Sequence, residues 1–413
     1  MNSDPMRGAT CTPVNFDSPE DFFGRDSGLV FRGLLDCGVA SLMIMPGVTP
    51  GMDSTGVLRA EESQLRDVTW WQRQELDFVL FYGWGDPRYL EVARAIRKAG
   101  ILLIQNLDAA GILTPYHDMK EWWTGTFGMI AGPQPLKRKF RLCGKALRDF
   151  FPAIYEKKRV RMLEESDLLA AVSPPAAESI RNYLSALGSP AASKLVVLPH
   201  PVIPRMNYEG RPKAKRVVCV GRWLEEDWHQ KDPKMMLDAL SAFLVRSPDW
   251  KAEVIGRGSS KLAELIRAGT DLPLERVTFT ERLGREELVA RYLVAEILFC
   301  PSRFESYHIS SAEALCCGCS IVVADHPLLA STCWFTTRNS GTIASRRSVS
   351  DIVEALCIEA RKWESGERLP RSIASEWSGI LHSRSVASRL LSFVRGSVPK
   401  SELLSPAPTP SAT

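Results

Sequence analysis

The sequence predicts an α/β protein made of two domains, each built around a parallel β-sheet. Short apolar runs recur along the chain, and many are followed by a segment with the periodicity of an amphipathic helix. The length of 413 residues is more than one hydrophobic core normally serves. Two domains of roughly 180 residues are therefore expected. A polar stretch rich in proline and glycine at 203–215 is the predicted hinge.

The composition is that of an ordinary globular protein, with 45% hydrophobic and 24% charged residues. The net charge of +4 is too small to indicate nucleic-acid binding. No apolar run is long enough for a transmembrane helix, and the start of the chain lacks the pattern of a signal peptide. The ten cysteines are dispersed, which is typical of buried thiols in a reducing cytoplasm. Cys316 and Cys319 form one C-x2-C pair without a second, so no metal site is expected.

The elements of the first domain, residues 21–202, are predicted from apolar periodicity. Residues 1–20 are polar and aperiodic and are expected to form a loose lead-in. A turn containing Gly28 is predicted to run into a helix that ends at Gly38. The other predictions are strands at 41–45, 78–82, 101–105, 167–173 and 194–202 and helices at 89–98 and 175–187.

Residues 136–161 predict a basic amphipathic helix. Apolar residues recur at helical spacing, and basic residues share another face. Such a helix either lies on an anionic membrane or is a surface helix whose basic face is solvated. The apolar residues are Phe140, Cys143, Leu147, Phe151 and Ile154, and the basic residues are Arg138, Arg141, Lys145 and Arg148.

The second domain, residues 216–375, begins with a strand that ends at Gly221 and Arg222. Lys231 follows nine residues after this arginine and precedes a helix at 234–244. A later strand ends in Gly-x-Gly, but the third glycine of a dinucleotide fingerprint is missing. The remaining predictions are strands at 252–255, 277–283, 295–300 and 320–324, helices at 286–292, 350–362 and 377–394, and a disordered tail at 397–413.

Two glutamates eight positions apart mark the most informative stretch of the sequence. A buried strand ends at Pro301, and a polar loop containing Glu305 follows. A short helix is predicted at 311–317, with Glu313 about one turn inside it and Gly318 at its end. In an open parallel sheet, ligands bind at the carboxyl ends of the strands, and unpaired N–H groups at a helix start can hold a phosphate.

This Glu-x7-Glu pair, between a strand ending in Pro-Ser and a helix closing in Cys-Gly-Cys, resembles the donor site of the group 1 (family 4-like) glycosyltransferases. The resemblance is strong over residues 216–324 and only topological over the first half. It implies a GT-B fold, with two facing Rossmann-like domains and a cleft between them. It also implies a retaining transfer of sugar from a nucleotide-diphosphate sugar to an acceptor hydroxyl, without a cofactor. The C-terminal helix, 376–396, would cross back to the first domain.

The resemblance also implies roles for individual residues. Glu305 would lie beside the transferred sugar and Glu313 would accept hydrogen bonds from ribose hydroxyls, while Arg222 and Lys231 would hold the diphosphate. The loop that approaches the diphosphate usually contains glycines, but Ser306 and His308 stand there in this chain. The implied donor-binding residues are Gly28, Gly221, Arg222, Lys231, Arg282, Leu283, Glu305, Ser306, Tyr307, His308, Ile309 and Glu313.

Asp108 and His117 are rival candidates for the polar residue that would face the donor sugar from the first domain. Asp108 would otherwise cap its own loop. The expected acceptor is a carbohydrate, a lipid-linked molecule or a small molecule, with no nucleic-acid partner. The expected location is cytoplasmic, and peripheral contact at the inner face of a membrane through 136–161 is left open as one of the two alternatives for that helix. The alternative function is a catalytically silent GT-B protein that serves as a binding or scaffold subunit.

Overall fold

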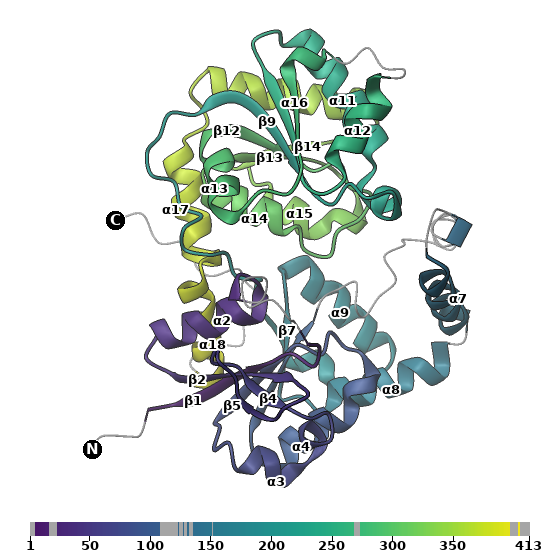
Figure 1. Cartoon of the computed structure of the whole chain (residues 1–413), viewed down its shortest axis with the longest axis vertical. Coiled ribbons are helices and arrows are strands. Elements are labelled where there is room, and N and C mark those ends of the chain that lie inside the picture. The colour runs from purple at the N-terminus through teal and green to yellow at the C-terminus, as the bar shows by residue number, and fades with distance from the viewer. Residues whose placement is uncertain are drawn as a thin grey trace. The chain divides into compact units, whose positions relative to one another are not determined.

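The computed structural model describes residues 5–15, 23–107, 135–150, 152–267 and 273–396, together with the single residues 123, 127, 130, 131 and 404. It consists of two α/β units (Figure 1). The first unit draws on Met1–Leu113, Phe150–Ile203 and Gly379–Thr413, and the second on Thr114–Asp149 and Pro204–Ser378. The second unit thus includes most of one helix, α7 (Leu136–Phe150), from within the predicted first domain.

The first unit is built on an eight-stranded sheet in the order β3-β4-β2-β1-β5-β6-β7-β8. All neighbours are parallel except the short β3 and β4. Apolar clusters cover both faces, one beneath α3 and α4 and the other beneath α2 and α18. The strands are β1 (Arg7–Cys11), β2 (Ala40–Pro46), β3 (Gly51–Met52), β4 (Leu58–Ala60), β5 (Phe78–Phe81), β6 (Leu102–Leu107), β7 (Leu168–Ala171) and β8 (Leu195–Val197). The helices are α2 (Asp26–Asp36), α3 (Val68–Gln72), α4 (Leu90–Lys98), α8 (Pro152–Glu164), α9 (Pro174–Ala186) and α18 (Ser383–Val394).

The lead-in predicted for residues 1–20 is wrong, because residues 7–11 form β1 inside the sheet. This strand pairs with β2 on one side and β5 on the other. Its small residues gave no apolar run in the sequence. They are needed because a large neighbour fills the space, since a Cβ at Gly8 would lie 2.2 Å from the Phe78 ring. A central strand can therefore lack a hydrophobic signature where bulky side chains of the adjacent strand cover it.

The single helix predicted over 136–161 is two helices, α7 and α8. Pro152 begins α8, and a proline inside a helix removes one backbone hydrogen bond and clashes with the preceding turn. A proline at the first position of a helix costs nothing, since that N–H has no helical partner. The break therefore falls where the backbone chemistry requires it.

The second unit is built on a six-stranded parallel sheet in the order β11-β10-β9-β12-β13-β14. The strands are β9 (Ala214–Val220), β10 (Lys251–Ile255), β11 (Val277–Thr280), β12 (Ala295–Phe299), β13 (Ser320–Ala324) and β14 (Gly341–Ala344). The helices are α10 (Trp228–Lys231), α11 (Pro233–Arg246), α12 (Ser259–Arg267), α13 (Arg285–Val294), α14 (Ile309–Cys316), α15 (Ala330–Phe335), α16 (Val349–Glu364) and α17 (Pro370–Leu381). The prediction of two parallel-sheet α/β units is confirmed.

The strand order of the second sheet creates a switch point between β9 and β12. From β9 the chain proceeds outward through β10 to β11, and then returns to β12 and proceeds the other way to β14. The connections after β9 and β12 therefore leave in opposite directions and open a crevice at the carboxyl ends of these two strands.

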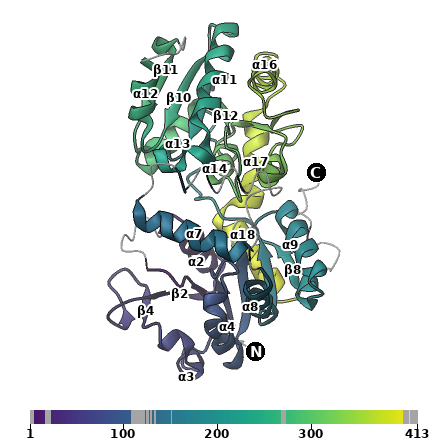
Figure 2. The same cartoon turned by 90° about the vertical axis from the view of Figure 1, so that its right-hand side faces the viewer.

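The helix predicted over 377–394 is interrupted at His382, so α17 and α18 are separate. His382 forms an isolated parallel bridge with Val202. The Val202 N–H donates to the Leu381 carbonyl at 2.7 Å, and the Ser383 N–H donates to the Val202 carbonyl at 3.1 Å. These bonds hold His382 in an extended conformation, and α18 then packs beside α2 (Figures 1 and 2).

A buried ion pair joins the end of the second unit's sheet to its last helices. Arg368 Nε lies 2.5 Å from Glu359 Oε1, and both side chains are fully buried. Arg368 also donates to the carbonyls of Arg338 and Gly341, while the Thr342 hydroxyl donates to Glu359. Every polar atom named here has a partner, which is the condition under which a buried pair is tolerated.

Replacing Arg368 with Met should destabilise the protein by about 3–5 kcal/mol, because the Glu359 carboxylate would stay buried without its counter-ion. Chemical unfolding followed by circular dichroism would measure the change. The control is Arg361→Gln, which breaks an exposed pair with Glu354 and should cost less than about 1 kcal/mol. Equal losses in the two variants would contradict this interpretation.

Candidate functional site

The crevice at the switch point is lined by two loops that carry most of the predicted site residues. Gly221 and Arg222 come directly after β9, and the loop containing Glu305 comes after β12 and leads into α14. Lys231 ends α10, the short helix that follows β9. The parallel sheet brings these loops to one edge because both strands end there.

Lys231 and Glu305 form a buried ion pair at the centre of this edge. Lys231 Nζ lies 2.5 Å from Glu305 Oε1, and the two side chains are 13% and 8% exposed. The Ser302 hydroxyl donates to the same carboxylate oxygen at 2.6 Å, and Gln230 Nε2 lies 3.4 Å from the other oxygen. The backbone N–H of Glu305 donates to the Leu328 carbonyl at 2.9 Å. The carboxylate is therefore fixed by groups from two segments, and a third segment holds the backbone of Glu305.

The surroundings of Glu305 keep it ionised. Burial on its own raises the pKa of this carboxyl, but the Lys231 ammonium and the hydrogen bonds from Lys231 and Ser302 outweigh burial. The pKa of Glu305 consequently lies below its ordinary value. At neutral pH the site presents a fixed carboxylate paired with a fixed ammonium.

Glu313 lies in α14, as predicted, and its surroundings differ from those of Glu305. The Tyr292 hydroxyl lies 3.4 Å from Glu313 Oε2. Burial raises the pKa of Glu313 to about 7, although Arg285 and the Tyr292 hydrogen bond oppose the shift. The two glutamates therefore differ in charge near neutral pH, because only Glu305 has a buried cation beside it.

The side chains that replace the usual glycines of this loop are packed into the unit. His308 is 4% exposed, immediately precedes α14, and its Nδ1 lies 2.7 Å from the Ser311 hydroxyl. Burial lowers the pKa of His308 to about 4, so the ring is neutral at physiological pH. Tyr307 is buried with its ring edge-on to Phe335 at a centroid distance of 5.1 Å. Ser306 is half-buried and Ile309, the first residue of α14, is exposed.

Arg222 lies at the same sheet edge, but its side chain is 67% exposed. Its guanidinium is 3.6 Å from Asp227, a buried residue of the segment between β9 and α10. The backbone beside it is crowded, because a Cβ at Gly256 would lie 1.8 Å from the Gly221 carbonyl. Only glycine fits at position 256, where φ is also +129°. The close approach of this backbone to the segment after β9 thus explains the Gly-x-Gly that follows β10.

Several predicted residues lie elsewhere in the fold or outside the described residues. Arg282 and Leu283 follow β11, at the far edge of the sheet from β12. Gly28 belongs to the first unit and is the third residue of α2, so the prediction of a turn at that position is wrong. Asp108 and His117 lie outside the described residues.

The sequence reasoning missed four residues that build the site. Ser302 and Gln230 bind Glu305, and Arg347 and Asp232 fasten the loops around it. Asp232 could have been recognised as a helix cap, because it precedes the proline that begins α11. Arg347 comes from the loop after β14 and carried no signal in the sequence.

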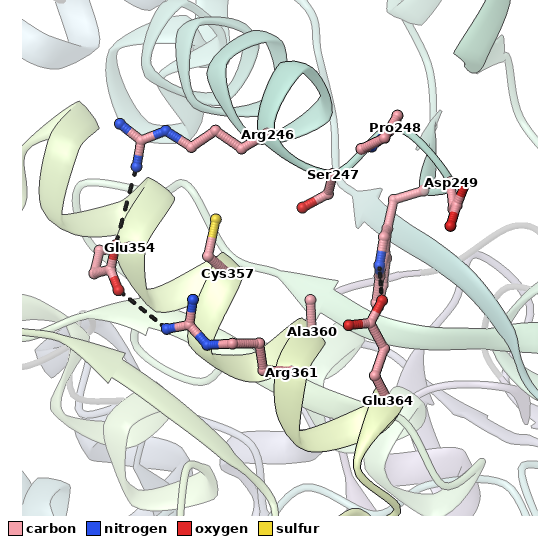
Figure 3. Close-up of a pocket in the computed structure, with 10 residues that line it drawn as sticks. Arg246, Ser247, Pro248, Asp249, Glu354, Cys357, Ala360, Arg361 and Glu364 are labelled. Atoms are coloured by element: carbon pink, nitrogen blue, oxygen red, sulfur yellow. Dashed lines mark hydrogen bonds and ion pairs between the residues drawn. The ribbon is translucent and has the colours of Figure 1, made fainter.

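A separate pocket of about 320 Å³ lies between the end of α11 and the outer face of α16 (Figure 3). Glu354 is paired there with both Arg246 and Arg361, at 3.9 and 3.2 Å. Trp250, which also lines this pocket, immediately precedes β10, so the pocket lies at the amino end of the sheet. No predicted site residue lines it.

Comparison with known proteins finds a family model that matches part of the second unit. Residues 214–358 match the family model described as "Glycosyl transferases group 1". A curated relative, the GDP-mannose:cellobiosyl-diphosphopolyprenol alpha-mannosyltransferase of Xanthomonas campestris, is 26% identical over 155 residues. This match covers 36% of the present chain and 39% of the relative's length.

Solved structures resemble the whole architecture. The lipopolysaccharide outer core galactosyltransferase WaaB has a TM-score of 0.59 at 15% identity, with 95% of this chain and 100% of that chain covered. Anabaena HepE, solved with UDP, has a TM-score of 0.62 at 12% identity and the same coverage. A glycosyltransferase of Rickettsia africae has a TM-score of 0.63 at 11% identity, with 95% and 99% covered. Because the sequence identities are only 11–15%, the similarity to these structures establishes the fold alone. Residues 214–358 are thus similar to the group 1 glycosyl transferases, and the fold of the chain is the GT-B fold.

Proposed function

We propose that this protein is a retaining glycosyltransferase that moves a sugar from a nucleotide-diphosphate sugar to an acceptor hydroxyl. The observation that carries the proposal is the buried Lys231–Glu305 pair at the switch point of the second sheet. A buried ion pair is costly to assemble, and its position at the ligand-binding edge of the fold gives it a use beyond stability. The similarity of residues 214–358 to the group 1 family supports the same activity.

Lys231 and Arg222 would stabilise the leaving nucleoside diphosphate. Negative charge builds up on the diphosphate as the bond to the sugar breaks, and fixed cations in a poorly hydrated site stabilise that charge. An ammonium has three donors, so Lys231 can hold Glu305 and still donate to a phosphate oxygen. Arg222 is exposed at the same edge and would close over the diphosphate from the solvent side.

Glu305 and Glu313 would hold different parts of the donor. Glu305, fixed by Lys231 and Ser302, would orient the hydroxyls of the transferred sugar. Glu313 would accept hydrogen bonds from the ribose. In this scheme the departing phosphate assists deprotonation of the acceptor hydroxyl on the same face of the sugar, which gives retention. A hexose is the proposed sugar, since the named relatives are a mannosyltransferase and a galactosyltransferase.

The second candidate is a silent subunit that binds a nucleotide sugar without transferring it. The buried His308 favours it, because a side chain stands where the family's glycines normally allow the backbone to meet the diphosphate. The two candidates predict the same binding and differ only in turnover. Asp108, His117, Gly28, Arg282 and Leu283 remain proposed contacts of the donor.

Helix α7 is the proposed contact with a membrane that carries the acceptor. Leu136 and Phe140 are 70% and 71% exposed, and Cys143 is exposed on the same helical stripe. Lys137 and Arg141 are exposed beside this stripe. Exposed apolar side chains flanked by cations suit the interface of an anionic bilayer. Among the described helices, none is both long and apolar enough to cross a membrane.

Glu305→Gln and Glu313→Gln should fail in different ways. Glu313 would contact the ribose in the ground state and the transition state alike, so its loss should mainly raise the donor KM. Loss of Glu305 should depress kcat by about tenfold to a thousandfold, with little change in nucleotide binding. Calorimetry with UDP-, GDP- and ADP-sugars would measure donor binding, and turnover assays would then measure kcat and KM. The control is Glu286→Gln, at an exposed glutamate.

Two results would count against the proposal. If none of the nucleotide sugars binds the unmodified protein, the donor-site assignment is wrong. If a nucleotide sugar binds but no transfer occurs to saccharide, lipid-linked or water acceptors, the silent subunit is the better account.

Donor affinity should rise with pH through about 7, because burial raises the pKa of Glu313 to about 7. Below that pH the carboxyl is protonated, and a ribose hydroxyl donates a weaker hydrogen bond to a neutral carboxyl group than to a carboxylate. Each pH unit below the pKa should weaken binding by up to about tenfold, and Glu313→Gln should flatten the curve. A nucleotide sugar is the suitable ligand, since it lacks the terminal-phosphate ionisation near pH 6. An unchanged slope in the variant would exclude Glu313 as its source.

Phe140→Asp should weaken binding to anionic vesicles at least tenfold, because it places a charge in the apolar stripe of α7. Co-sedimentation with vesicles of phosphatidylglycerol would measure the change, and neutral phosphatidylcholine vesicles would test the role of Lys137 and Arg141. The control is Leu187→Asp, an exposed apolar residue just after α9. Equal vesicle binding by the two variants would show that the helix is only a solvated surface helix.

A further inference from the structure

Three loops meet at the carboxyl edge of the second sheet, and one side chain joins them. The first loop follows β9 and carries Lys231 and Asp232, the second follows β12 and carries Pro301 and Ser302, and the third follows β14 and carries Arg347. We propose that Arg347 is a positioning residue: by binding Asp232 and the carbonyls of Pro301 and Ser302 together, it sets the placement of Lys231 against Glu305. This inference rests on the proposed function of that pair.

The guanidinium of Arg347 makes contacts in two directions. Its NH2 donates to Asp232 Oδ2 at 2.5 Å and to the Pro301 carbonyl at 3.0 Å. Its Nε lies 3.4 Å from the Ser302 carbonyl. The planar fork of arginine offers several donors in fixed directions, so one side chain can hold two loops at a set separation.

Asp232 is held in a conformation that it would not adopt without support. Its φ and ψ are 46° and 62°, the left-handed region that is uncommon for residues other than glycine. Its Oδ1 lies 3.4 Å from the Met235 N–H and caps α11, while Oδ2 is shared by Arg347 and Arg303, the latter at 3.0 Å. Strained backbone persists where its surroundings over-determine it, and it gathers at functional sites. Asp232 directly follows Lys231, so its conformation sets the direction in which Lys231 leaves the backbone.

A second set of contacts connects Arg347 to Glu305. The Ser302 carbonyl faces Arg347, and the Ser302 hydroxyl donates to Glu305 Oε1 at 2.6 Å. The same two loops are also joined through the backbone, where the Arg303 N–H donates to the Gln230 carbonyl at 2.8 Å. Each member of the Lys231–Glu305 pair is therefore one residue or one hydrogen bond away from a group that Arg347 holds.

A purely stabilising arginine and a positioning arginine predict different effects. Loss of a stabilising residue lowers the unfolding free energy and leaves turnover of the folded molecules unchanged. Loss of a positioning residue loosens the two loops and slows the chemical step, because small displacements of oriented groups have large effects on rate.

The test uses Arg347→Gln and Asp232→Asn in the full chain. Asparagine tolerates the left-handed region and caps helices as well as aspartate does, so Asp232→Asn removes only the charge that binds the two arginines. The matched control is Arg346→Gln, an exposed arginine next to Arg347. Amide hydrogen exchange read by mass spectrometry needs no identified donor and reports directly on segments 224–232 and 301–308.

Both variants should speed exchange in these two segments together by about tenfold or more, with the rest of the second unit unchanged. With a nucleotide sugar that the unmodified protein turns over, both should lower kcat by about tenfold or more while donor KM changes less than about threefold. The loss in the double variant should be clearly smaller than the product of the two single losses, because the two residues share one contact.

Several outcomes would overturn the inference. Exchange that changes only around 345–348, or equally across the unit, would make Arg347 a local or general stabiliser. Losses that multiply in the double variant would show that Arg347 and Asp232 act separately. If no nucleotide sugar is turned over, the proposed function fails, and the exchange result still decides whether Arg347 couples the two loops.

Discussion

The buried contact between Lys231 and Glu305 is the constraint on which the candidate site depends. Removing two charges from water costs several kcal/mol for each ion unless close partners satisfy them. The chain meets this requirement at one sheet edge, where the segment after β9 supplies an amide and an ammonium and the loop after β12 supplies a hydroxyl to the carboxylate. The parallel topology brings the loops to that edge, and the ion pair fixes how closely they must approach. The unusual backbone of Asp232 follows from that requirement.

The two glutamates show how one fold can give the same side chain two electrostatic states. Both are buried, and burial alone favours the neutral acid. Glu305 has an ammonium at hydrogen-bond distance, whereas Glu313 has a tyrosine hydroxyl and a more remote arginine. The first is a permanent anion that organises its surroundings, and the second can change its charge with its ligand. Sequence spacing alone could not have separated these behaviours.

The sequence was sufficient where a local pattern decides the structure. Apolar runs located most strands, and the two glutamates were correctly assigned to a loop and a helix because Pro301 and Gly318 mark the ends of those elements. The predicted elements were wrong where residues distant in the sequence determine the local structure. β1 is a strand because it pairs with β2 and β5, and the break at His382 exists because Val202 pairs with its neighbours. Arg347 was missed for the same reason, since its partners lie more than forty residues away in the chain.

The first unit is closed by the last helix of the chain, and this affects the order in which the protein can be completed during synthesis. Val386, Leu390 and Phe393 of α18 share an apolar cluster with Val30 and Leu34 of α2. A ribosome delivers α2 before the strands of the second unit and α18 after them. Until α18 leaves the exit tunnel, the face of the first unit that it packs on has no cover for its apolar side chains. The first unit therefore starts before the second unit and is completed after it, and until then these apolar side chains of the nascent chain are exposed.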